Sequence, residues 1–231
     1  MTSLTVRVAE NNVVNATIIR LTATDLDLGD NAHFDYVISD VTAYCADAAG
    51  CVIDDVMTVS SGAFDVDRHS GLLNVTARLD REKHSYFRVT VFAVDRGLPT
   101  QTGSTIVEVV VDDVNDHQPT FLSSRNSTGN RNGGLELAVG EDAADGAVVG
   151  RLKAVDLDAT SPNNRMYYSF RSWQRQSSKF EVDAETGEVR VSGRLDREVE
   201  STYRLTAVVT DAGRPRLSAV EQLVITVWDL V

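Results

Sequence analysis

The chain has 231 residues, 42% of them hydrophobic, and its 34 acidic side chains outnumber 22 basic ones for a net charge of −12. This length accommodates two domains of about 100 to 115 residues, and the hydrophobic fraction excludes disorder along the whole chain. The negative charge disfavours nucleic acid and anionic lipid as partners and favours cations, and no apolar run reaches the roughly 18 residues that a membrane span needs.

Runs of β-branched, largely alternating residues predict strands. In chain order they cover residues 87–94, 105–111, 203–209 and 223–227. Turn signals separate the runs, and no stretch has the period of an amphipathic helix. Many short strands at this spacing predict an all-β fold with two tandem antiparallel β-sandwiches. The Ser-, Asn- and Gly-rich segment 123–134 predicts a loop at the start of the second sandwich.

The chain repeats itself. Leu-Asp-Arg-Glu at 79–82 recurs at 195–198, and Val-Asp-Arg-Gly-Leu-Pro at 94–99 is echoed at 210–215; both offsets are 116 residues. A period of this length indicates two copies of one domain rather than one large domain. We therefore expect the domains to cover residues 1–116 and 117–231.

The first copy carries an insertion. Its interval from Tyr36 to Phe64 is 28 residues, against 12 residues in the second copy. The extra residues are expected to form a loop, and they contain both cysteines, Cys45 and Cys51. Their spacing does not match a zinc or redox motif, which leaves a small disulfide-closed loop or free thiols; an extracellular setting would favour the disulfide.

Three N-glycosylation sequons, at Asn15, Asn74 and Asn126, agree with such a setting. The four histidines are scattered, and no serine or cysteine is placed to form a catalytic triad with any of them. We therefore expect no enzymatic activity.

Two acidic motifs invite comparison with the calcium loops of helix-loop-helix proteins. They are Asp25-Leu26-Asp27 and Asp156-Leu157-Asp158, but the twelfth position of each loop is Tyr36 or Tyr167 instead of the required bidentate Glu. The flanking sequence is also strand-like. Calcium takes six to eight oxygen ligands, so several short acidic motifs could still bind it if they met at a joint between two domains.

The ordered set of acidic motifs resembles the cadherin family over almost the whole chain. The family pattern is a Glu near the start of a repeat, then Asp-x-Asp, then Asp-Arg-Glu, a later Asp, and an Asp-x-Asn-Asp-Asn linker. The matching residues are Glu10, Asp80 and Glu82 in the first repeat, Asp113, Val114, Asn115 and Asp116 in the linker, and Asp156, Asp158 and Asp211 in the second repeat. The resemblance implies seven-stranded Greek-key sandwiches joined by a calcium-binding linker.

The resemblance also implies three Ca²⁺ ions at the junction between the repeats. The pair nearer the first repeat would be bound by Glu10, Asp80, Glu82 and Asp116, with help from Asp113 and Asp158. The third ion would be bound by Asn115, Asp156, Asp158 and Asp211. His117 stands where the linker usually has its second Asn, and it would still bind through its backbone carbonyl, as would Asn163. Carboxylates about 4 Å apart repel by about 1 kcal/mol in water, so calcium would convert repulsion into coordination and fix the angle between repeats.

Two further half-sites would face repeats that this sequence does not contain. They comprise Asp25, Asp27 and Asp95 at one end and Glu141, Asp196 and Glu198 at the other. We expect both to be poorly occupied.

By resemblance, the chain is part of a membrane-anchored ectodomain on the extracellular side of the plasma membrane, which mediates calcium-dependent adhesion to another cadherin ectodomain, homophilic or heterophilic. No small-molecule substrate is expected. The absence of a Trp near the N-terminus favours the long cadherins of protocadherin, Fat or Dachsous type over those that exchange a terminal strand. Two alternatives stay open: a rigid spacer or force-bearing tether without partner contact, and a calcium-dependent module of a secreted enzyme or toxin-binding receptor.

Overall fold

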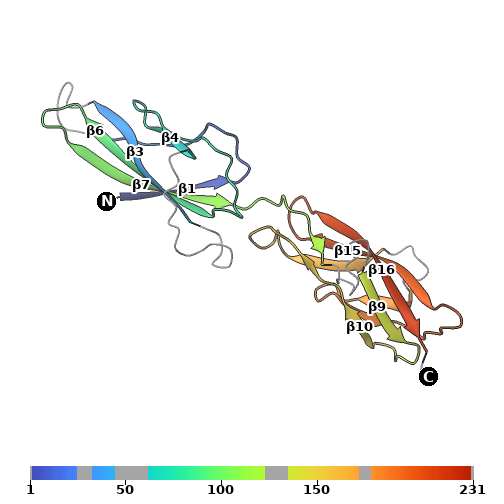
Figure 1. The fold of residues 1–231 in the computed structure, drawn as a ribbon. Coiled ribbons are helices and arrows are strands. Elements are labelled where there is room, and N and C mark those ends of the chain that lie inside the picture. The colour runs from blue at the N-terminus through green and yellow to red at the C-terminus, as the bar shows by residue number, and fades with distance from the viewer. Residues whose placement is uncertain (1, 25–32, 45–61, 123–134, 172–177, 230–231) are drawn as a thin grey trace. The chain divides into compact units, whose positions relative to one another are not determined.

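The computed structural model describes residues 2–24, 33–44, 62–122, 135–171 and 178–229. The chain divides into two compact units, Met1–Val114 and Asn115–Val231, drawn from blue to green and from green to red in Figure 1. Each unit is described by itself below, as the first and the second unit. No helix among the described residues is both long and apolar enough to cross a membrane.

The first unit is a sandwich of two sheets. One sheet has four strands in the order β1-β7-β6-β3, and the other has three in the order β2-β5-β4. The strands are β1 (Thr2–Ala9), β2 (Ala16–Arg20), β3 (Phe34–Tyr44), β4 (Phe64–Val66), β5 (Leu72–Val75), β6 (Tyr86–Asp95) and β7 (Thr102–Asp112).

The second unit repeats this plan. Its four-stranded sheet has the order β12-β15-β16-β9, and its three-stranded sheet has the order β10-β14-β13. A short pair, β8 with β11, is added. The strands are β8 (Thr120–Phe121), β9 (Leu135–Gly140), β10 (Val148–Arg151), β11 (Ala154–Val155), β12 (Met166–Phe170), β13 (Phe180–Val182), β14 (Glu188–Val191), β15 (Thr202–Asp211) and β16 (Ser218–Trp228).

Each unit buries its own hydrophobic core between its two sheets. Hydrophobic and polar residues alternate along the long strands. Because successive side chains of a strand point to opposite faces, the hydrophobic ones face the core. On β6, Phe87, Val89 and Val91 are buried while Arg88 between them is exposed. The second core is centred on side chains such as Leu205, which has no exposed surface. The prediction of two tandem β-sandwiches is therefore confirmed.

The structure adds three details to the predicted sheets. The first strand of each four-stranded sheet pairs with the last strand in parallel, β1 with β7 and β9 with β16, while the other pairs are antiparallel. The long strands extend beyond the predicted runs, because backbone pairing continues through residues without an alternating pattern. The start of the insertion is not a loop: β3 continues to Tyr44, paired with Tyr86 of β6.

A tyrosine and a glycine pack against each other at equivalent positions in both units. The Tyr36 hydroxyl accepts a hydrogen bond from the Ala23 amide at 2.9 Å, as the Tyr168 hydroxyl does from Ala154 at 3.1 Å. Gly71 lies against the Tyr36 ring with φ +68°, and an added Cβ there would lie 2.5 Å from the Leu21 carbonyl oxygen. A side chain at this position would collide with that carbonyl, which explains Gly at this point of both copies.

Candidate metal centres in the two units

A buried carboxylate forms the centre of the acidic cluster in the first unit. Glu10 follows β1 and is only 3% exposed. Its Oε2 accepts a hydrogen bond from the Arg81 amide and its Oε1 accepts one from the Val114 amide, both at 2.7 Å. These two hydrogen bonds hold the side chain beside the Leu-Asp-Arg-Glu segment. Glu10 therefore ties that segment to the beginning of the linker.

Asp80 and Glu82 complete this cluster. One carboxylate oxygen each of Glu10, Asp80 and Glu82 lies within 4.8 Å of the others. Lys83 places its ammonium 2.8 Å from Asp80, three residues earlier in the chain, and the interaction raises the pKa of Lys83. The lysine side chain is 73% exposed, so another cation can readily replace the Lys83 ammonium at Asp80.

The second unit has its own polar centre, around Asp211 at the end of β15. This side chain has no exposed surface. Its Oδ1 accepts a hydrogen bond from the Gly213 amide at 3.0 Å, and its Oδ2 accepts from the Leu217 amide at 2.9 Å and from the Asn115 side chain at 3.0 Å. Asn115 Nδ2 also donates to the Pro215 carbonyl at 2.6 Å. The linker residue is thereby anchored to the loop after β15.

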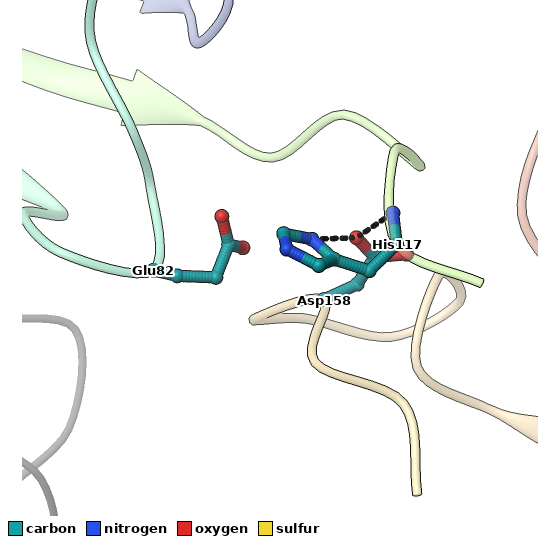
Figure 2. Close-up of side chains that lie close together, drawn as sticks. All are labelled: Glu82, His117 and Asp158. Atoms are coloured by element: carbon teal, nitrogen blue, oxygen red, sulfur yellow. Dashed lines mark hydrogen bonds and ion pairs between the residues drawn. The ribbon is translucent and has the colours of Figure 1, made fainter. Parts of the chain in front are cut away.

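Asp158 is the second buried carboxylate of this centre. Its Oδ1 accepts a hydrogen bond from the His117 amide at 3.1 Å, and the His117 ring Nδ1 lies 3.2 Å from the same oxygen (Figure 2). His117 Nδ1 is also 2.9 Å from Asp116. Burial raises the pKa of Asp158, and the neighbouring charge of Asp156 adds to the increase. A carboxylate in this state is stabilised by any cation that reaches it.

Two buried oxygens of the second unit fit a metal ion. Asn115 Oδ1 and Asp158 Oδ2 are inaccessible to solvent and accept no hydrogen bond from the residues that the structure describes. Leaving a buried oxygen unsatisfied costs about 1–3 kcal/mol, and more for a charged one. Carboxylate and amide oxygens are the ligands that Ca²⁺ prefers. The donor set therefore fits a hard cation of this kind.

The remaining predicted ligands lie in the connecting segments. Asp113 follows β7 directly and is half-buried, Val114 donates its amide to Glu10, and Asn163 lies in the turn 161–164 that follows the Asp-Leu-Asp motif. Within the first unit the structure brings together Glu10, Asp80 and Glu82, and within the second unit it joins Asn115 to Asp211 and His117 to Asp158.

Gly213 is a part of the second centre that the sequence interpretation did not single out. An added Cβ would lie 2.2 Å from the Asn115 side-chain carbon. The available signal was the recurrence of Gly97 at Gly213, two residues after each buried Asp.

We expect Gly213→Ala to displace the Asn115 amide from Asp211 and to lower the free energy of unfolding of the second unit by about 1–3 kcal/mol, the usual cost of overpacking. Gly103→Ala is the matched control, because nothing lies within 4 Å of its added Cβ. Urea unfolding followed by circular dichroism, which reports on both units, measures the effect in the two variants. Equal stability of the two variants would mean that the Asn115 anchor contributes nothing.

The half-sites named from the sequence are only partly described. Asp25 and Asp27 lie outside the described residues, while Asp95 is 6% exposed and accepts hydrogen bonds from Gly97 and Gln101. At the other end, Glu141 accepts from the Arg197 amide at 3.2 Å and Asp196 from the Val199 amide at 3.2 Å. Asp95 and Asp211 therefore occupy equivalent places in the two units.

Cys45, Cys51 and the sequon at Asn126 also lie outside the described residues. Of the other two sequons, Asn15 is exposed in a turn, with φ +65°. Asn74 lies within β5 and accepts a hydrogen bond from Thr17 Oγ1 at 2.7 Å. Glycosylation at these positions stays a prediction.

Comparison with known proteins agrees with the repeat. The family model described as "Cadherin domain" matches residues 4–112 and 136–228. The chain is 32% identical over 221 residues to cadherin EGF LAG seven-pass G-type receptor 3 of Mus musculus, covering 96% of this chain and 6% of that protein. It is 36% identical over 220 residues to protein dachsous of Drosophila melanogaster, covering 93% of this chain and 6% of that protein.

A solved structure extends the similarity to three dimensions. The cis-dimer structure of protocadherin gammaB7 extracellular domains 3–6 superposes with a TM-score of 0.80 at 26% identity, covering 98% of this chain and 49% of that one. This chain spans only 6% of the length of each of the two curated relatives named above.

Proposed function

Since this chain belongs to the cadherin family, we propose that it is part of an adhesive ectodomain whose two repeats are joined and stiffened by calcium. The family as a whole is adhesion-related, and the long members of Dachsous type are among the relatives of this chain.

The observation that carries the proposal is the pair of anchors on adjacent linker residues. Val114 is hydrogen-bonded to the buried carboxylate of Glu10, and Asn115, the next residue, is hydrogen-bonded to the buried carboxylate of Asp211. The acidic centres of the two units are therefore joined through a single peptide bond. This connectivity supports the inference that ions bound at the linker take ligands from both repeats.

We assign three Ca²⁺ ions to this junction. The proposed ligands are Glu10, Asp80, Glu82, Asp113, Asn115, Asp116, Asp156, Asp158 and Asp211, with backbone carbonyls from Val114, His117 and Asn163 as further candidates. The support is chemical: a deficit of hydrogen-bond donors at Asn115 Oδ1 and Asp158 Oδ2, and three clustered carboxylates in the first unit. Without a cation, carboxylates this close repel one another and weaken the site.

The proposed partner is another cadherin ectodomain, and the proposed location is the outer face of the plasma membrane. The related protocadherin gammaB7 structure is a cis-dimer, which supports a partner from the same family. Membrane anchoring of the full-length protein and the absence of enzymatic activity stay predictions.

Calcium titration with thermal melting tests the metal assignment. Extracellular calcium modules bind at about 10⁻⁴ to 10⁻³ M, so 5 mM calcium contributes about 1 to 2 kcal/mol for each bound ion and raises the melting temperature. Chelator is expected to reverse the rise, and Asp116→Ala to reduce it. Glu181→Ala, an exposed acid on β13, is the control with the same change of charge. No rise in the unmodified protein would refute the calcium assignment.

Adhesion is tested separately, by aggregation of beads coated with the chain. We expect calcium-dependent aggregation, with itself or with a second cadherin ectodomain. Beads that stay dispersed, from a chain that does bind calcium, would favour the rigid spacer.

A further inference from the structure

The four-stranded sheet of the first unit carries apolar side chains on the face opposite its core, here called the outer face. Successive side chains of a strand point to opposite faces, so those that alternate with the buried residues of β6 and β7 point outward. On the edge strand β3, Val37 and Tyr44 are 47% and 37% exposed. The other large apolar or aromatic side chains of the outer face are half-buried and lie outside the described core; they are Tyr86, Phe92, Val94, Ile106 and Val110.

Cross-strand pairing arranges the outer face in rows that complement one another. Two rows between β6 and β7 are Tyr86 opposite Val110 and Arg88 opposite Glu108. The next two are Thr90 opposite Ile106 and Phe92 opposite Ser104. Each row therefore joins a large side chain to a smaller one, or two opposite charges.

This arrangement is complementary to a second copy of itself. The relevant rotation is 180° about an axis that lies on the outer face, midway between β6 and β7 and parallel to them. It places β6 of one copy on β7 of the other, so that each side chain faces the cross-strand partner of its own equivalent. Arg88 then meets Glu108 of the other copy, and the Phe92 ring meets the small side chain of Ser104. Self-complementarity of this kind is what a two-fold interface requires.

The flanking strands fit the same rotation. The order β1-β7-β6-β3 is symmetric about the axis, so β3 of one copy lies over β1 of the other. Tyr44 then faces Arg7, which already pairs with Asp112, and the ring offers it a cation–π contact. Asp40 faces the hydroxyl of Ser3 and not a second acid. Sheets that pack face to face keep their strands aligned in this way, within about 30°.

The positions of the charges favour a second copy as the occupant. A chain with a net charge of −12 repels its own copies over most of its surface. On the outer face, the rotation instead places Arg88 against Glu108. At the end of the face beside the start of β3, Asp35 is paired with Arg68 and Arg96, each at 2.7 Å. The match therefore depends on the position of each charge and not on a net excess of either sign.

The fold does not require this pattern, because the second unit lacks it. At the offset of 116 residues, Arg204 is equivalent to Arg88. It lies opposite the apolar Val224, so this row has no opposite charge. The neighbouring row is Thr202 opposite Thr226, two polar residues of equal size. The complementary rows are thus a property of the first unit.

We propose that the outer face of the first unit binds the outer face of a second copy and forms a two-fold dimer. Because the axis is parallel to the strands, both chains run in the same direction, as two proteins anchored side by side in one membrane would. The inference goes beyond the proposed adhesion and rests on it only for this membrane setting. Four strands offer a plane of about 500 Å² over eight residues. This is less than the roughly 800 Å² per partner of a standard interface, so association is weak and negligible at the micromolar concentrations of a melting experiment.

Sedimentation velocity of the whole chain tests the dimer, at fixed ionic strength and fixed free calcium and at up to about 0.5 mM protein. We expect a reversible dimer. Arg88→Glu and Glu108→Arg each place like charges against one another across the axis, so each is expected to weaken association at least tenfold. Arg204→Glu is the matched control, because it makes the same change at the equivalent exposed position of the second unit and is expected to leave the dimer unchanged.

Mixing the two variants separates dimerisation from an effect within one copy. Arg88→Glu presents two acids in this row and Glu108→Arg presents two bases, so an equimolar mixture is expected to regain the dimer that neither variant forms alone. A mixture that stays monomeric, while both variants melt cooperatively, would overturn the proposal. Equal weakening by Arg204→Glu would also overturn it. An unmodified chain that stays monomeric while its coated beads aggregate would reject this surface and leave the proposed adhesion in place.

Discussion

Leu73→Ala is expected to destabilise the first unit by about 2–5 kcal/mol and to leave the second unit unchanged. Leu73 lies on β5 with no exposed surface, at the centre of the first core, and truncation removes buried methyl groups and leaves a cavity. The two units have separate cores, so the cavity acts on one of them.

The chain offers a convenient way to follow the units separately. Its two tryptophans, Trp173 and Trp228, both belong to the second unit. In chelator, Leu73→Ala should therefore lower the unfolding midpoint seen by circular dichroism and leave the fluorescence midpoint in place. Leu205→Ala, the reciprocal control, should move the fluorescence midpoint. If Leu73→Ala shifted both midpoints equally, the units would unfold as one cooperative body.

Glu10→Gln is expected to remove most of the stabilisation by calcium while changing the calcium-free protein little. The amide group cannot replace a carboxylate that accepts from both Arg81 and Val114, and the lost charge-assisted hydrogen bond costs about 1.5–3 kcal/mol. Relief of repulsion with Asp80 and Glu82 offsets this cost when no cation is bound. With calcium present there is no repulsion left to relieve, and Glu10→Gln removes a charged ligand of the ion.

Fluorescence adds a sharper test of sharing between the units. If the ions have ligands from both units, Glu10→Gln in the first unit also reduces the calcium-dependent rise of the unfolding midpoint that the tryptophans of the second unit report. Glu108→Gln, on β7 of the same unit, is the control for the change of charge. A fluorescence midpoint that responds to calcium equally in Glu10→Gln and in the unmodified protein would show that each unit binds its ions alone.

His117 illustrates what residue identity can and cannot predict. The family pattern implied only a backbone contribution from this position. In the structure its ring lies between Asp116 and Asp158, at 2.9 Å and 3.2 Å. The ring position depends on side-chain packing around a buried carboxylate, and no motif encodes that.

The sequence by itself determined the fold class, the two copies and the acidic residues at the ends of the strands. It did so because strand alternation and Asp-rich turns are local patterns, and because repetition 116 residues apart makes each weak motif support the other. The buried state of Glu10 and Asp211 was not visible in this way, since burial depends on strands far apart in the chain.

Only the tertiary structure decided which polar residues meet. Asp35, Arg68 and Arg96 are separated by up to 61 residues, and no local sequence pattern predicts that they meet. They meet because the β4–β5 turn and the end of β6 both lie beside the start of β3, where the Tyr36 amide bonds to the Arg68 carbonyl. Local pattern therefore specifies the strands, whereas the register between distant strands specifies the sites.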